Sequence, residues 1–154
     1  MDTYRLLKFL HLAAVTLWIG GAFTTAVLIR RVTQARDRAM LASLLRHTGF
    51  YGRAVVGPAS LLTLVSGLGM LAVLGLRPHE LPWIQWGFAG ILGHFVLAAG
   101  FIRRATARLA ALATAPEEDA GGLDVAMRRL GLLNTMYLGL LLSVVGAMAL
   151  KPTF

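Results

Sequence analysis

The chain has 154 residues, of which 57% are hydrophobic and 14% are charged, with a formal net charge of +8 and no cysteine. Soluble domains carry about 25% charged residues, so this composition predicts an integral membrane protein of one domain, residues 1–154. The lack of cysteine excludes disulfides, thiolate metal sites and thiol catalysis. The positive charge does not indicate nucleic-acid binding, because no soluble basic patch with interleaved aromatic residues occurs.

Four apolar segments each approach the ~20 residues that a helix needs to cross a bilayer. They cover about residues 4–29, 58–76, 82–102 and 130–150. Each is expected to be a helix, because lipid offers no hydrogen-bond partner to an open backbone. Successive segments joined in this way predict an all-α fold, a membrane-spanning up-down four-helix bundle.

The first segment contains a histidine inside an apolar stretch. His11 precedes Trp18 by seven residues, which is two helical turns, so the two side chains are expected to share one helix face. An ionisable or ligating group at membrane depth is costly and therefore predicts a functional site.

The connection that follows, residues 30–57, contains leucines and a methionine at helical spacing with arginines opposite. This pattern predicts an amphipathic segment over about residues 36–48, which either lies on the membrane or leads into the second span. Gly57 and Pro58 then either start the second span or kink it.

Small residues recur along the second, third and fourth segments, which predicts close helix contacts there. They are Ser60, Ser66 and Gly67 in the second segment, Gly87, Gly90 and Ala98 on one face with His94 in the third, and Gly139, Ser143 and Ala147 in the fourth. The run PEEDAGG at 116–122 between the third and fourth segments predicts a loop.

Lysine and arginine are distributed unequally between the two sides. Eleven lie in the connections after the first and third segments, and four lie near the termini and in the short connection at 77–81. The positive-inside rule therefore predicts that both termini are periplasmic, in a multi-pass protein of the bacterial inner membrane.

His11 and His94 are the candidate ligands. They lie about 10 Å and about 17 Å from the same membrane face, by the rise of a helix, on two separate segments. Two imidazoles on different helices at comparable depth predict a b-type haem between them, with Trp18 and Asn134 beside it. The alternative is that both histidines only bond to Ser, Thr or Asn on neighbouring helices.

Other chemistry finds less support in the sequence. His79 is expected in a turn and His47 at the membrane interface, and the scattered methionines do not predict a copper site. No catalytic triad, phosphate loop or dinucleotide motif is present. No acidic residue lies within a predicted span, which argues against a proton-coupled carrier.

The chain resembles a superfamily of small four-span bacterial membrane proteins. This superfamily includes predicted integral membrane proteins of unknown function, CopD-type copper-resistance membrane domains and HemJ-type protoporphyrinogen oxidase. The first segment, with His11, Trp18, Gly20, Gly21 and Phe23, is similar to the opening of HemJ proteins. The stretch GPASLLTLVSGLGML at 57–71 is similar to the second span of the unknown-function family. The fourth segment is similar to the last span of both families, because a polar residue, Asn134, stands at its start and the pair Lys151-Pro152 closes it.

The HemJ resemblance implies that His11 is a haem ligand and that the fold is a four-span bundle. Two departures argue against its porphyrinogen oxidase activity. Gly87 lies near the position of a HemJ lysine, and Thr135 follows Asn134 where HemJ proteins have an acidic residue.

Three functions therefore stay open. The first is haem binding for electron transfer or haem handling, and the second is a non-catalytic accessory subunit that packs against other membrane proteins. The third is a porphyrinogen oxidase, so the sequence does not decide whether the protein is an enzyme. The partners expected are the lipid bilayer and other membrane subunits, without nucleic acid.

Overall fold

A computed structural model describes residues 2–77, 79, 81–115 and 120–151. Within these residues the regular structure is helical, without strands. The elements are α1 (Thr3–Ala35), α2 (Arg38–Tyr51), the π-helical segment η1 (Gly52–Val56), α3 (Gly57–Leu74), α4 (Pro82–Phe95), the π-helical segment η3 (Val96–Ile102), α5 (Arg103–Thr114) and α6 (Ala120–Leu150). Residues 116–119 of the predicted loop, and Pro152 of the closing Lys-Pro pair, lie outside the described residues. Residues 120–122, which were predicted as loop, instead begin α6.

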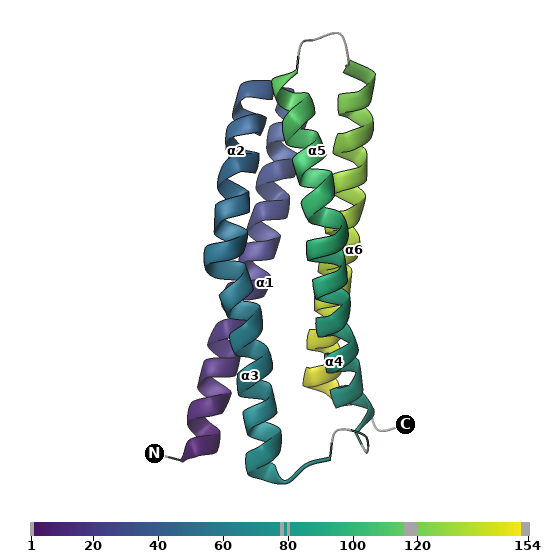
Figure 1. The fold of residues 1–154 in the computed structure, drawn as a ribbon. Helices are drawn as coiled ribbons and strands as arrows, with labels where there is room; N and C mark the ends of the chain where they lie inside the picture. The colour runs from purple at the N-terminus through teal and green to yellow at the C-terminus, as the bar shows by residue number, and fades with distance from the viewer. Residues whose placement is uncertain (1, 78, 80, 116–119, 152–154) are drawn as a thin grey trace.

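These elements join into four helices that are long and apolar enough to cross a membrane. They are Thr3–Ala35, Arg38–Leu74, Pro82–Thr114 and Gly121–Leu150. Successive helices run in opposite directions, and both chain ends lie at one end of the bundle (Figure 1). We call this the terminal end, and the opposite end, which holds the α1–α2 turn, the arginine-rich end. The predicted four-span up-down architecture is confirmed.

The second helix is continuous through Pro58. Proline lacks an N–H group and its ring clashes with the carbonyl four residues earlier, which an ordinary α-helix cannot accommodate. The preceding segment η1 opens into a π-helix, in which the Gly57 N–H bonds to the Gly52 carbonyl five residues earlier. Of the two predicted alternatives, Pro58 therefore does not start the span, since it lies inside the continuous helix Arg38–Leu74.

The predicted amphipathic segment is part of the bundle. α2 leads directly into the second span and buries Leu41, Ala42 and Leu45. Its apolar side joins one cluster formed with the ends of α1, α5 and α6. The buried members of this cluster are Ile29, Val32, Leu41, Ala42, Leu45, Ala105, Leu109, Ala113, Leu123, Ala126 and Leu130. The four helices thus stay packed beyond the apolar stretches, toward the arginine-rich end.

α1 packs most extensively against α3, and α4 packs against α6. The glycines of α4 allow the second contact. A Cβ at Gly87 would collide with Met148, and one at Gly90 would collide with Val144. Because these α4 positions lack side chains, the branched and long side chains of α6 fit against the helix backbone.

The small residues of the fourth span form the predicted contact only in part. Ser143 accepts a hydrogen bond from Trp86 Nε1 of α4 at 3.3 Å, whereas a Cβ at Gly139 would meet open space. The prediction was wrong at Gly139 because spacing of four shows that residues share a face but not which face meets a neighbour. In α6 the packed face carries the larger side chains instead.

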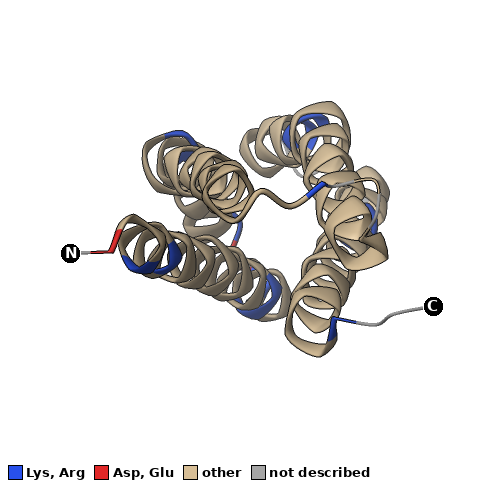
Figure 2. Ribbon diagram, turned by 90° about the horizontal axis from the view of Figure 1, so that it is seen from below, with Lys and Arg blue, Asp and Glu red and all other residues tan. Residues whose placement is uncertain are grey.

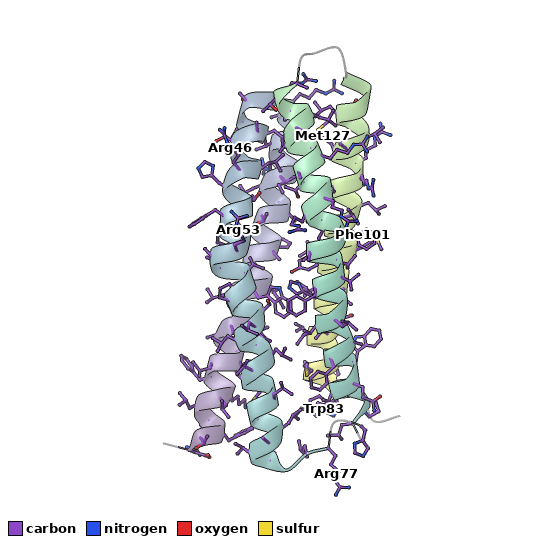
Figure 3. The ribbon with its side chains drawn as sticks, in the orientation of Figure 1. Arg46, Arg53, Arg77, Trp83, Phe101 and Met127 are labelled. Carbon is purple, nitrogen blue, oxygen red and sulfur yellow. The ribbon has the colours of Figure 1, made fainter. Side chains whose placement is uncertain are left out.

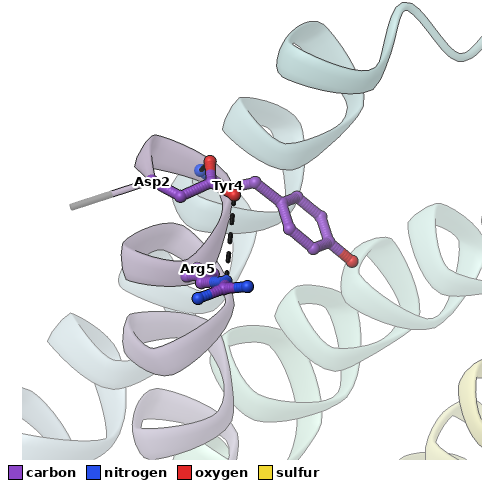
Figure 4. A network of polar contacts seen from close by, with 3 residues as sticks. All are labelled: Asp2, Tyr4 and Arg5. Carbon is purple, nitrogen blue, oxygen red and sulfur yellow. Dashed lines mark hydrogen bonds and ion pairs between the residues drawn. The ribbon is translucent and has the colours of Figure 1, made fainter.

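Polar groups close the helix ends. Asp2 caps α1 by accepting a hydrogen bond from the Tyr4 N–H at 3.2 Å, and its other oxygen lies 3.9 Å from Arg5 Nε (Figure 4). Gly75, with φ of 64°, ends α3 in the left-handed conformation that glycine adopts without strain.

Aromatic and basic side chains mark the terminal end. Lys151 Nζ lies 5.5 Å from the ring centroid of Trp83, and Arg77 points away from the bundle beyond it (Figure 3). Such residues are typical of a membrane boundary. Viewed from this end, basic positions outnumber acidic ones around the bundle (Figure 2).

Candidate functional site

His11 of α1 is held by α3. Its Nδ1 lies 2.9 Å from the backbone carbonyl of Thr63 and 3.2 Å from Ser66 Oγ. A carbonyl oxygen only accepts hydrogen bonds, so Nδ1 carries the proton. Ser66 Oγ donates its own proton to the Leu62 carbonyl, which leaves a lone pair toward His11. In the neutral imidazole Nε2 therefore has a free lone pair.

The α3 residues around His11 share a spacing. Ser60, Thr63 and Ser66 recur every three residues and are all buried, with exposed fractions of 1%, 5% and 1%. Each hydroxyl donates to a carbonyl of its own helix, which allows a polar group to remain in an apolar span. The Thr63 carbonyl was not predicted as a partner of His11, because every residue carries a backbone carbonyl and the sequence does not indicate which one is used. The contact with Ser66 is of the kind expected under the alternative that the histidine bonds to Ser, Thr or Asn on a neighbouring helix.

His94 belongs to a second buried network at the middle of the bundle. Its Nδ1 lies 2.7 Å from the hydroxyl oxygen of Tyr137 on α6. Trp18 of α1 donates from Nε1 to the same oxygen at 2.9 Å. The Trp18 and His94 rings meet edge to face, with centroids 4.6 Å apart. Three helices are thus joined through one phenol oxygen.

The proton in this second network has two possible positions. The Tyr137 oxygen accepts from Trp18, and it can either donate to Nδ1 of His94 or accept from it. In the first arrangement Nε2 of His94 carries a proton, and in the second it has a free lone pair. Only in the second arrangement is His94 able to ligate a metal.

The two candidate ligands have different neighbours. His11 contacts α3, whereas His94 contacts Trp18 and Tyr137. Trp18 follows His11 by seven residues, about 10 Å along α1, so the His94 ring lies about two turns from the level of His11. The structure therefore does not bring the two imidazoles together as one ligand pair.

His11 and Trp18 both pack against α3, as their shared face predicts. His11 bonds to Thr63, whereas Trp18 packs in a cluster with Ala59 of α3 and with Tyr137 and Leu141 of α6. Asn134 lies three residues from Tyr137 on α6 and is half-buried. Of the residues predicted beside a haem, Trp18 contacts His94.

The other two histidines lie outside both networks. His47 of α2 is exposed and bonds through Nδ1 to the Ser43 carbonyl at 2.8 Å. It lines an open groove of about 460 Å³ between α1 and α2, together with Thr24 and Tyr51. His79 lies in the connection at the terminal end, where its carbonyl accepts from Gln85 at 2.8 Å. Among the described residues, no three His, Asp or Glu side chains gather around one point as a metal site.

The fold and these two networks define a class: a four-span helical membrane protein with two histidines held inside the bundle. The chain belongs to the family described as predicted integral membrane protein (DUF2269), whose model matches residues 5–152. Comparison with curated proteins and with solved structures found no match in either set.

Proposed function

We propose that this protein binds a b-type haem within the membrane, with His11 as an axial ligand, and serves in electron transfer or haem handling. The observation that carries the proposal is the bond from Nδ1 of His11 to the Thr63 carbonyl. Histidines that ligate metals through one ring nitrogen commonly donate the other to a carbonyl or carboxylate, which fixes the ring and the tautomer. The donor chemistry of His11 therefore fits a haem iron.

His94 is the proposed second ligand, under two conditions. Its Nδ1 must donate to Tyr137, and, because His94 lies about two turns from the level of His11 in this structure, the two share one iron only if the helices pack differently when haem is bound. Trp18 and Asn134 are proposed to line the same site. A bound haem supplies one-electron redox chemistry, while the chain orients the ligand and excludes water.

We place the protein in the bacterial inner membrane, with its arginine-rich end in the cytoplasm. The unequal distribution of lysine and arginine supports this orientation.

The test is the visible spectrum of the protein purified in mild detergent, oxidised and reduced, before and after haem is supplied. We expect a sharp α-band on reduction that His11→Ala abolishes. His47→Ala is the matched control, because His47 is an exposed imidazole outside both networks. If His94 is the second ligand, His94→Ala converts the spectrum from low-spin to high-spin. A preparation that stays colourless with added haem contradicts the proposal.

A non-catalytic accessory subunit is the second candidate. It is favoured by one observation: within the described residues, every buried side-chain nitrogen and oxygen already has a protein partner. No fully buried polar atom among these residues is therefore left for a cofactor to satisfy. Under this alternative the protein stays colourless alone and copurifies with larger membrane subunits, which affinity purification from membranes would identify.

Porphyrinogen oxidase is the third candidate. Gly87, near the position of a HemJ lysine, faces Met148 of α6, and Thr135 donates to the Gly131 carbonyl at 3.0 Å. Neither position offers the charge that the resemblance requires. Oxidation of protoporphyrinogen by the purified protein, lost in His11→Ala, is the result that would support this activity.

A further inference from the structure

Three arginines from two helices surround one cavity toward the arginine-rich end. Arg104 and Arg108 lie one turn apart on α5, and Arg129 lines the same cavity from α6. The cavity measures about 210 Å³, and its remaining lining is Ala105 and Ala126. These alanines are almost fully buried, whereas the three arginines are exposed, so the cavity opens at the protein surface between basic side chains.

No acidic side chain in the lining of this cavity balances the positive charge of the three arginines. None of the five lining residues is acidic. The ion pair found among the described residues, between Asp2 and Arg5, lies at the opposite end of the molecule. Three cations held around one space repel one another, and an anion between them removes that repulsion. Guanidinium groups also match phosphate oxygens in bidentate hydrogen bonds, which lysines cannot reproduce.

The position of the cavity relative to the membrane indicates which kind of anion it would meet. The apolar stretch of the third helix ends at Ile102, and the arginines begin at the next residue. Arg104 therefore lies where hydrocarbon gives way to headgroups, at the level of lipid phosphates. Basic pockets between membrane helices at this depth commonly bind anionic headgroups.

We propose that Arg104, Arg108 and Arg129 form a binding site for the phosphate of an anionic phospholipid in the leaflet at the arginine-rich end. The headgroup phosphate occupies the cavity above Ala105 and Ala126, and the acyl chains extend along the exposed apolar surface of the membrane-spanning helices. The site is independent of haem binding, because its residues contact neither His11 nor His94.

The test uses the full-length protein, delipidated in detergent and titrated with phosphatidylglycerol while bound lipid is counted by native mass spectrometry. Phosphatidylcholine with the same acyl chains tests the need for net negative charge, and inorganic phosphate tests the need for a lipid. We expect saturable binding of phosphatidylglycerol, weaker binding of phosphatidylcholine, and no displacement by millimolar phosphate.

The variant is Arg104→Gln/Arg129→Gln, and the matched control is Arg30→Gln/Arg31→Gln, which removes two exposed charges of α1 toward the same end. Losing the charged hydrogen bonds is expected to weaken phosphatidylglycerol binding about tenfold in the variant and less than about twofold in the control. Circular dichroism establishes that both variants are folded. Equal weakening in both, equal affinity for both lipids, or displacement by inorganic phosphate would overturn the proposal.

Discussion

The His11 imidazole lies between a carbonyl that fixes it and a glycine that leaves room for it. Nδ1 bonds to Thr63, and the ring edge faces Gly67 one turn further along α3. A Cβ at Gly67 would lie 3.3 Å from Cε1 of His11 and 3.5 Å from Nδ1. α3 therefore provides both the carbonyl that bonds to Nδ1 and the room that the ring occupies. A side chain at position 67 would move the ring relative to that carbonyl, whose hydrogen bond fixes the tautomer that the proposed ligand requires.

Gly67→Ala tests this coupling. The added methyl group requires the imidazole to shift by a few tenths of an ångström beside the Thr63 carbonyl, and overpacking of this kind costs about 1–3 kcal/mol, of which the helix preference of alanine offsets about 1 kcal/mol. We expect a lower midpoint of thermal unfolding in detergent and, if haem is bound, a shifted spectrum. Gly139→Ala is the control, because its Cβ meets open space and the substitution only favours the helix. Equal effects of the two substitutions would contradict the packing described around His11.

Tyr137→Phe tests the second network. The substitution removes the oxygen shared by Trp18 and His94 and leaves two buried polar groups without a partner. Each unsatisfied group costs about 1–3 kcal/mol, so a clear loss of stability is expected in denaturant titrations followed by tryptophan fluorescence. Tyr4→Phe, near the terminal end, is expected to change stability by less than about 0.5 kcal/mol. A neutral Tyr137→Phe would show that the three side chains do not depend on this oxygen.

At the scale of the element, α2 distinguishes a packed helix from one that lies on the lipid. Leu41 is 2% exposed inside the cluster at the arginine-rich end, whereas its neighbour Met40 is 56% exposed. Sequence periodicity placed both on one apolar stripe, so it left the two alternatives open. Contacts with α5 and α6 decide between them, and these contacts link residues far apart in the chain.

Leu41→Ala and Met40→Ala form the matched pair for α2. Truncating the buried leucine leaves a cavity and is expected to cost about 2–5 kcal/mol, whereas truncating the exposed methionine is expected to cost less than about 1 kcal/mol. Unfolding free energies from denaturant titrations provide the comparison. Similar costs at both positions would indicate that α2 lies on the membrane surface.

At the scale of the whole molecule, hydropathy and charge were enough to predict the number of spans and their order. They predicted the ends of the spans less well, because an arginine marks the end of an apolar stretch without ending a helix. α1 continues past Arg30 and Arg31 to Ala35. The register of neighbours was not predictable either, because the rotation of each helix depends on its packing partners. His11 was thus identified as an imidazole within a span, while its partner Thr63 was not.

The orientation of the bundle in the membrane is open to direct measurement, because the chain has no native cysteine. Gln34→Cys introduces a thiol on an exposed position beside the α1–α2 turn, and Arg77→Cys introduces one at the terminal end. If the arginine-rich end is cytoplasmic, a membrane-impermeant thiol reagent labels Arg77→Cys in intact bacterial cells and labels Gln34→Cys only after permeabilisation. The reverse pattern would put the proposed phospholipid site in the outer leaflet. It would also show that the eleven basic residues of the two connections do not set the topology.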